Sequence, residues 1–90
     1  MSKRISYKVE GEVQGVFFRK FAVEQAKAAG VTGFVKNASD GSVTGEAQGS
    51  EDSLKQFVQH LHNGPSAAEV HNVSQSDIQT KSGETGFGQH

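Results

Sequence analysis

The sequence contains no cysteine, and its charges almost balance. Nine lysines and arginines stand against ten aspartates and glutamates, so the formal net charge is -1. Without cysteine the chain can form no disulfide, no thiolate metal site and no cysteine nucleophile. Without an excess of positive charge, no field draws it to nucleic acid or to an anionic membrane. Recognition of a ligand must therefore be local, and we expect neither nucleic acid nor membrane among the partners.

Long apolar runs are missing as well. The opening residues, MSKRISYKVEGEV, are partly basic but lack the apolar stretch that a signal peptide needs, and no segment approaches a membrane-spanning length. With 90 residues, the chain is expected to form one domain, residues 1–90, around one modest core. We expect a soluble, cytoplasmic monomer.

Hydrophobic periodicity predicts alternating strands and helices. Apolar residues at every second position predict a strand at residues 4–10, and Asp40-Gly41 predicts a turn between two further strands, residues 31–37 and 42–48. Apolar residues three or four apart predict helices at residues 18–29, before Gly30, and in the segment from Ser50 to Pro65. A fourth strand is predicted at residues 69–78, with a bulge where Val70 and Val73 break the alternation.

The order of these elements predicts the fold class. Strand, helix, strand, strand, helix, strand is the split βαβ pattern of a ferredoxin-like α+β sandwich. We expect an antiparallel sheet of four to five strands with both helices on one face. The last twelve residues, QTKSGETGFGQH, form either a short edge strand or a loose tail, since Phe87 is their only large apolar residue.

The segment GEVQGVFFRKF, residues 11–21, places Arg19 and Lys20 at the start of a predicted helix. That end of a helix repels cations, and its free N–H groups bind anions, above all phosphate. Gly11 and Gly15 would let the backbone approach such an anion, and the guanidinium of Arg19 would add further donors. The pattern is neither GxGxxG nor a Walker loop. From spacing alone, an ordinary glycine-containing loop followed by a surface arginine remains an alternative.

Two longer segments narrow the choice. VEGEVQGVFFR (residues 9–19) and GFVKNASDGSVTGEAQG (residues 33–49) closely resemble the two signature segments of the acylphosphatase family. The resemblance implies a metal-free, cofactor-free hydrolase of small-molecule acyl phosphates, with inorganic phosphate as product and inhibitor. It also implies catalytic roles for Arg19, which would grip the phosphate oxygens, and Asn37, which would orient the attacking water. The phosphate would be held by the backbone of Gln14, Gly15, Val16, Phe17 and Phe18 together with Arg19.

The chemistry agrees with these roles. A phosphate cradle without cysteine forms no thiol-type phosphoenzyme, so water must attack directly. An acyl phosphate already carries a good leaving group, and phosphoryl transfer requires mainly positioning and charge stabilisation. The Asn37 amide can hold a water in line because it has both a donor and an acceptor. If the second strand pairs alongside the first, Asn37 lies at the same edge as the loop and Arg19.

Other interpretations are weaker. Asn37 also suits a hairpin turn, where asparagine often bonds its own backbone. An RNA-recognition module lacks its RNP1-like string here, but a non-catalytic phosphate- or ligand-binding regulatory module of the same fold stays open. The spacing around Asp40 does not fit a calcium loop.

The remaining histidines and aromatic residues suggest no second site. We expect no metal site, because His60 and His62 do not share a helix face and are expected to be solvated. Most phenylalanines are expected in the core, but Phe17 lies next to the cradle, where it could contact the acyl group. We expect residues 84–90 to fray, with more effect on stability than on activity.

Overall fold

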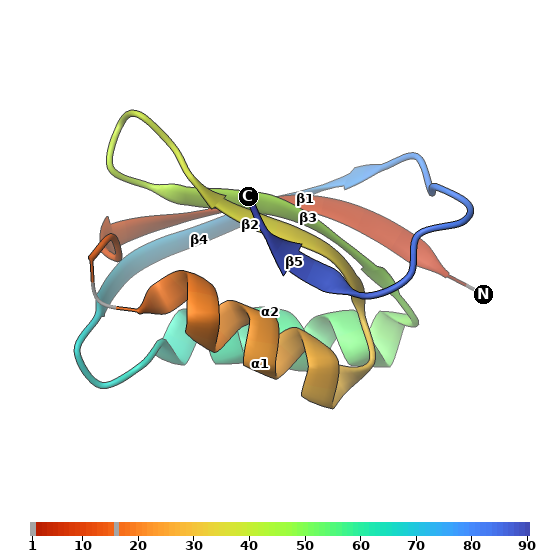
Figure 1. The fold of residues 1–90 in the computed structure, drawn as a ribbon, viewed down its shortest axis with the longest axis horizontal. Coiled ribbons are helices and arrows are strands. Elements are labelled where there is room, and N and C mark those ends of the chain that lie inside the picture. Colours follow the sequence, from red (N-terminus) through yellow and green to blue (C-terminus); the bar gives the residue numbers. More distant parts are fainter. Residues whose placement is uncertain (1, 16) are drawn as a thin grey trace.

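The computed structural model describes residues 2–15 and 17–90, and it has the expected order of elements. Figure 1 shows a twisted sheet with both helices on one of its faces. The elements are β1 (Lys3–Glu12), α1 (Phe18–Ala29), β2 (Thr32–Asn37), β3 (Val43–Gly49), α2 (Glu51–Asn63), β4 (Glu69–Ile78) and β5 (Phe87–Gln89). The ferredoxin-like split βαβ prediction is confirmed.

The C-terminus of α1 and the N-terminus of α2 lie where the sequence predicts. α1 stops at Gly30, which adopts the left-handed conformation (φ 77°) that glycine reaches without steric cost. α2 starts at Ser50, whose side-chain oxygen accepts a hydrogen bond of 3.1 Å from the Ser53 N–H, and Glu51 and Asp52 occupy its first turn. α2 therefore has a cap and anions at its N-terminus, which α1 does not.

The strand order is β4-β1-β3-β2-β5. β1 pairs antiparallel with β3 and β4, and β2 pairs antiparallel with β3. The expectation of an antiparallel sheet is wrong, because the sheet is mixed: β5 runs parallel to β2. The condition considered for Asn37, pairing of the second strand alongside the first, is not met, because β3 lies between β1 and β2.

The predicted bulge in β4 is confirmed. The pairing of β1 with β4 shifts between Glu10 and Gly11, whose partners are Asn72 and Val70, so His71 is left over. A side chain at Gly11 would collide with the carbonyl oxygen of Glu69. Glycine is therefore required at this close approach.

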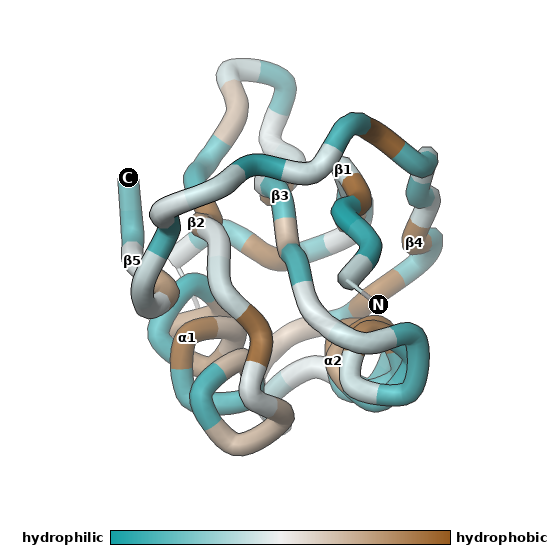
Figure 2. The backbone as a smooth tube through the Cα atoms, turned by 90° about the vertical axis from the view of Figure 1, so that its right-hand side faces the viewer, coloured by the Kyte–Doolittle hydropathy of each residue, from teal (hydrophilic) through white to brown (hydrophobic). Residues whose placement is uncertain are grey.

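The core lies between the sheet and the helices, as the side view in Figure 2 shows. Alternate residues of β1, beginning with Ile5, belong to the same hydrophobic cluster as the buried residues of both helices. The buried face of each helix consists of three residues, namely Phe18, Ala22 and Ala26 of α1 and Leu54, Phe57 and Leu61 of α2.

The core contains the buried hydroxyl of Tyr7, which reaches its hydrogen-bond acceptor because the neighbouring strand has a glycine opposite it. The Tyr7 hydroxyl donates a 2.8 Å hydrogen bond to the carbonyl oxygen of Phe34, and burial raises the pKa of the hydroxyl. Tyr7 lies opposite Gly45 in the β1–β3 register, and a side chain at Gly45 would collide with both the hydroxyl and that carbonyl. The absence of a side chain at Gly45 therefore leaves room for the Tyr7 side chain.

The C-terminal segment is a short edge strand, so the loose-tail alternative is wrong. Phe87 is 7 % exposed and meets Phe57 edge-on, with the ring centroids 5.4 Å apart. The connection from β4 crosses from one edge of the sheet to the other (Figure 2). Buried Arg4 holds it there through hydrogen bonds to Glu84 at 2.9 and 3.2 Å. Whether residues 84–90 fray remains a prediction.

Candidate active site

The N-terminus of α1 has neither a side-chain cap nor an acidic residue in its first turn, so it is suited to bind an anion. Its N-cap residue, Phe17, makes no side-chain cap hydrogen bond, and the first turn contains no acidic residue. Arg19 and Lys20 lie in that same turn. The free N–H groups and the positive end of the helix dipole therefore add to two cationic side chains. A bound anion would satisfy all of them.

A hollow of about 370 Å³ opens at this helix end. It is lined by Val13, Gly15, Phe17, Phe18, Arg19, Lys20, Asn37 and Gln89. None of these lining residues is acidic, and two are cationic. The sequence-predicted residues Arg19 and Asn37 thus meet at one hollow, together with Gly15, Phe17 and Phe18 of the predicted cradle. Gln14, another member of the predicted cradle, is not among the residues that line the hollow. Val16 lies outside the described residues.

Asn37 reaches the hollow across the sheet, although β1 and β2 are not neighbours. It pairs with Val43, and Val43 pairs with Val9, so the three residues form one row across β2, β3 and β1. Residues directly opposite each other point to the same face of a sheet. Val9 and Val43 are fully buried on the helix face, so Asn37 stands on that face too, at the end where α1 begins. Register, rather than direct pairing, brings Asn37 to Arg19.

The side chain of Gln14 ties the loop after β1 to the β2–β3 turn. Its Nε2 donates hydrogen bonds to the carbonyl oxygens of Ala38, at 2.8 Å, and Ser42, at 2.9 Å. The sequence assigned Gln14 only a backbone role in the cradle. The amide instead spans the gap between the segment that precedes Arg19 and the segment that follows Asn37.

The turn itself is held rigidly. Asp40 accepts hydrogen bonds from the backbone N–H of Ser42 at 3.0 Å and from its hydroxyl at 2.6 Å. Its other carboxylate oxygen lies 2.9 Å from the Lys8 ammonium. The hydrogen bonds from Ser42, and then that from Lys8, hold the pKa of the Asp40 carboxyl well below its usual range. Asp40 therefore supports the turn that carries Asn37, as Asx geometry in hairpins does.

Arg19 is left available for a ligand. Among the described residues it forms no ion pair, and its one hydrogen bond, from Nη1 to the carbonyl oxygen of His90, is long at 3.4 Å. The ring of His90 stacks on Phe34, with centroids 4.8 Å apart. The stacking and the hydrogen bond from Arg19 together place the end of β5 beside the hollow and orient the guanidinium.

Sequence reasoning missed the contribution of the last strand. Gln89 lines the hollow and a backbone oxygen of His90 accepts a hydrogen bond from Arg19, whereas the tail was expected to affect stability more than activity. The only signal was the apolar residue Phe87 among polar neighbours, since the parallel pairing of β5 with β2 is not visible in local periodicity. Lys20 also lines the hollow and received no role from the sequence.

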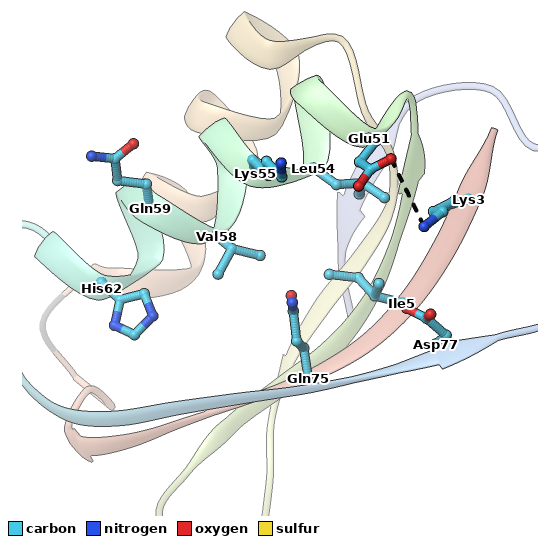
Figure 3. Close-up of a pocket in the computed structure, with 10 residues that line it drawn as sticks. All are labelled: Lys3, Ile5, Glu51, Leu54, Lys55, Val58, Gln59, His62, Gln75 and Asp77. Atoms are coloured by element: carbon cyan, nitrogen blue, oxygen red, sulfur yellow. Dashed lines mark ion pairs between the residues drawn. The ribbon is translucent and has the colours of Figure 1, made fainter. Parts of the chain in front are cut away.

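A second hollow, of about 300 Å³, lies between α2 and strands β1 and β4, and Figure 3 shows the residues that line it. Two lysines, Lys3 and Lys55, line it together with two carboxylates, those of Glu51 and Asp77, and the Lys3 ammonium lies 3.9 Å from the Glu51 carboxylate. A phosphate would therefore meet carboxylates there. The hollow at α1 is the better candidate for an anionic substrate.

Residues 2–15 and 17–90 contain no group of three histidine, aspartate or glutamate side chains that could hold a metal ion. Neither helix in these residues is long and apolar enough to cross a membrane.

Known proteins share both the sequence and this architecture. The sequence model of the acylphosphatase family matches residues 5–88. An acylphosphatase of Salinibacter ruber is 46% identical over 71 residues, which cover 79% of this chain and 75% of that protein. The solved acylphosphatase of Coxiella burnetii has a TM-score of 0.93 at 36% identity and covers 99% of this chain and 93% of its own. The solved acylphosphatase of Bacillus subtilis has a TM-score of 0.93 at 33% identity, and the match covers 100% of this chain and 99% of the Bacillus chain. The chain belongs to the acylphosphatase family.

Proposed function

We propose that the hollow at the N-terminus of α1 hydrolyses the carboxyl–phosphate bond of a small acyl phosphate by direct attack of water. Membership of the acylphosphatase family gives the reaction, hydrolysis of an acid anhydride. The observation that carries the location is that Arg19 and Asn37 meet at a helix N-terminus whose N-cap residue makes no side-chain hydrogen bond. The products are a carboxylate and inorganic phosphate.

The phosphoryl group binds to the loop and to Arg19. Backbone N–H groups of residues 14–18 and the first turn of α1 donate to its oxygens, and the guanidinium adds a fork of charge-assisted hydrogen bonds. The loose transition state of phosphoryl transfer spreads charge over these same oxygens. Donors fixed in place by the fold stabilise that charge without reorganisation.

Asn37 holds the attacking water. Its amide oxygen accepts a hydrogen bond from the water or its amide N–H donates one to it, and the group stays neutral throughout. A strong general acid is unnecessary because the leaving group is a carboxylate. The absence of acidic residues among those that line the hollow also suits a substrate that arrives with two negative charges. These features support a reaction that needs neither metal nor cofactor.

A chelator experiment tests the proposal. Benzoyl phosphate hydrolysis is measured with EDTA present in the wild type, Arg19→Ala, Asn37→Ala and the control Lys27→Ala. Lys27 lies in the last turn of α1, away from the hollow, so its loss removes one cation from the same helix. We expect wild-type and Lys27→Ala turnover to persist in EDTA, while both site variants lose activity. Metal-dependent turnover, or full activity in either site variant, would overturn the mechanism.

The two site variants should differ in what they lose. Arg19→Ala removes charge-assisted bonds worth about 1.5–3 kcal/mol each, so KM and kcat both worsen. Asn37→Ala lowers kcat and leaves phosphate affinity nearly intact, since the water and not the phosphate loses its partner. Inorganic phosphate should inhibit the wild type competitively and raise its melting temperature by mass action. Loss of both phosphate effects would count against the cradle.

We also propose that residues 1–90 act as one cytoplasmic domain and as a monomer. One hydrophobic cluster includes residues of both helices and of four strands. Both proposed catalytic residues come from the same chain, so the site needs no second copy. Sedimentation at assay concentrations that gave a dimer as the active species would contradict the monomer. The regulatory-module alternative has no comparable support.

A further inference from the structure

Phe17 combines two features that folding does not favour. Its side chain is 78 % exposed, although it is a large hydrophobic residue. Its backbone is left-handed, with φ 60° and ψ 23°, and among the described residues it is the one non-glycine with a positive φ. Both features cost free energy, and bulky residues in this conformation are rare.

Nothing local explains the choice of phenylalanine. The side chain makes no cap hydrogen bond to α1, and in the described part of the chain its ring is absent from the aromatic pairs, which include its neighbour Phe18 with Phe21. Glycine or asparagine would adopt the same backbone conformation more easily. Strained backbone conformations cluster at functional sites, where the strain is often part of the mechanism. We therefore ask what function the Phe17 ring serves.

The place of the ring indicates that role. Phe17 lines the hollow with Arg19 and Asn37, and it lies two residues before Arg19 in the chain. Of the other apolar lining residues, Val13 and Phe18 are 1 % exposed and belong to the core. Phe17 therefore supplies the large apolar surface that a ligand in this hollow can reach. An acyl phosphate that places its phosphoryl group at the α1 N-terminus must leave its acyl group toward solvent, beside this ring.

We propose that Phe17 is a specificity-determining residue whose ring packs against the acyl group and favours aromatic or extended apolar acyl phosphates over acetyl phosphate. The proposal rests on the hydrolysis proposed above and adds the substrate class. A bare phosphate ion carries no acyl group, so its binding should be independent of the ring. A small acetyl group offers little area to pack against it, whereas a benzoyl group offers a flat face.

The test compares two substrates in variants that keep the backbone. Phe17→Asn and Phe17→Gly both suit the left-handed conformation, so either change removes the ring with little disturbance of the loop. We measure kcat/KM for benzoyl phosphate and acetyl phosphate, and the inhibition constant of inorganic phosphate. Phe17→Trp retains an aromatic ring, and Phe21→Leu changes an aromatic residue of α1 that does not line the hollow.

We expect the benzoyl-to-acetyl ratio of kcat/KM to fall about 3- to 10-fold in Phe17→Asn and Phe17→Gly, as the loss of an aromatic contact predicts. Phosphate inhibition should stay within about twofold of the wild type, and Phe17→Trp and Phe21→Leu should keep the ratio. The melting temperature should not fall in Phe17→Gly, because the exposed ring contributes no core packing.

An unchanged ratio would overturn the proposal. So would an equal loss on both substrates with weakened phosphate inhibition, because the ring would then act through the cradle. Failure of the proposed hydrolysis looks different, since the wild type would then turn over neither substrate.

Discussion

Gln14 offers the sharpest test of how the two halves of the site are held together. Its Nε2 group donates to the carbonyl oxygens of Ala38 and Ser42, which lie on either side of the β2–β3 turn. Gln14→Met keeps the length of the side chain but removes both hydrogen bonds. The turn retains its own closure, the 2.8 Å bond from the Ala38 N–H to the Ser42 carbonyl oxygen. The change therefore separates the loop from the turn without unfolding either.

The expected magnitude follows from the two bonds. A neutral hydrogen bond contributes about 0.5–1.5 kcal/mol net, and water can replace part of it here because Gln14 is exposed. We expect a loss of about 1–2 kcal/mol in the free energy of unfolding. One kcal/mol corresponds to about 4–8 °C in melting temperature for a domain of this size. The loss should be visible in both urea and thermal unfolding.

Activity should respond unequally. In the proposed mechanism, phosphate binds to the loop and to Arg19, whereas Asn37, the proposed water-positioning residue, belongs to the strand that leads into the freed turn. We therefore expect kcat to fall by about 10-fold, the scale of a positional error of a fraction of an ångström, while the inhibition constant of phosphate changes little. Gln56→Met, an exposed glutamine of α2, serves as the control and should change neither quantity.

Three results would refute this reasoning. An unfolding free energy equal to that of the wild type would mean that the two bonds contribute nothing in solution. Unchanged kcat would mean that the turn needs no tie to the loop. Equal losses in kcat and phosphate affinity would mean that the Gln14 side chain supports phosphate binding itself, rather than holding the loop against the turn.

Three further predictions concern the frame around the site. Glu84→Gln removes the negative charge that faces buried Arg4, whose hydrogen bond lowers the pKa of the Glu84 carboxyl. A lowered folded-state pKa adds stability above the unfolded value of about 4.5, and this stability is lost as pH falls through the folded value. Urea unfolding should therefore show the wild type more stable by about 2 kcal/mol at pH 7, with the gap closing below about pH 4. A gap that persists at pH 3 would exclude the charge of Glu84 as its source. Gly45→Ala should lower the free energy of unfolding by at least about 2 kcal/mol, because the new methyl group meets the Tyr7 hydroxyl and the Phe34 carbonyl, whereas Gly88→Ala, which meets nothing within 4 Å, should change it little; similar values for the two variants would argue against the tight fit at Tyr7. Amide hydrogen exchange should be faster in residues 84–90 than in β1, since β5 pairs on one side only and β1 on both, and equal protection of the two segments would show that the last strand does not fray.

Local patterns in the sequence predicted the local elements of this protein. The spacing of apolar residues in 18–29, followed by Gly30, specifies α1 because a helix buries residues three to four apart and needs a left-handed residue to end. Ser50 specifies the start of α2 in the same way, through a hydrogen bond within one turn. The two signature segments around Arg19 and Asn37 predicted the family, which the comparisons confirm.

Only the tertiary structure decided how these pieces meet. Periodicity states which residues are buried but not which strands are neighbours, so β3 between β1 and β2, and the parallel addition of β5, could not be read from the chain. The amide bridge of Gln14 and the contact of Arg19 with His90 join residues 24 to 71 positions apart, and such contacts form only once the sheet has set its register. Asn37 reaches the hollow for the same reason: its row across the sheet, and not its place in the sequence, puts it opposite the start of α1.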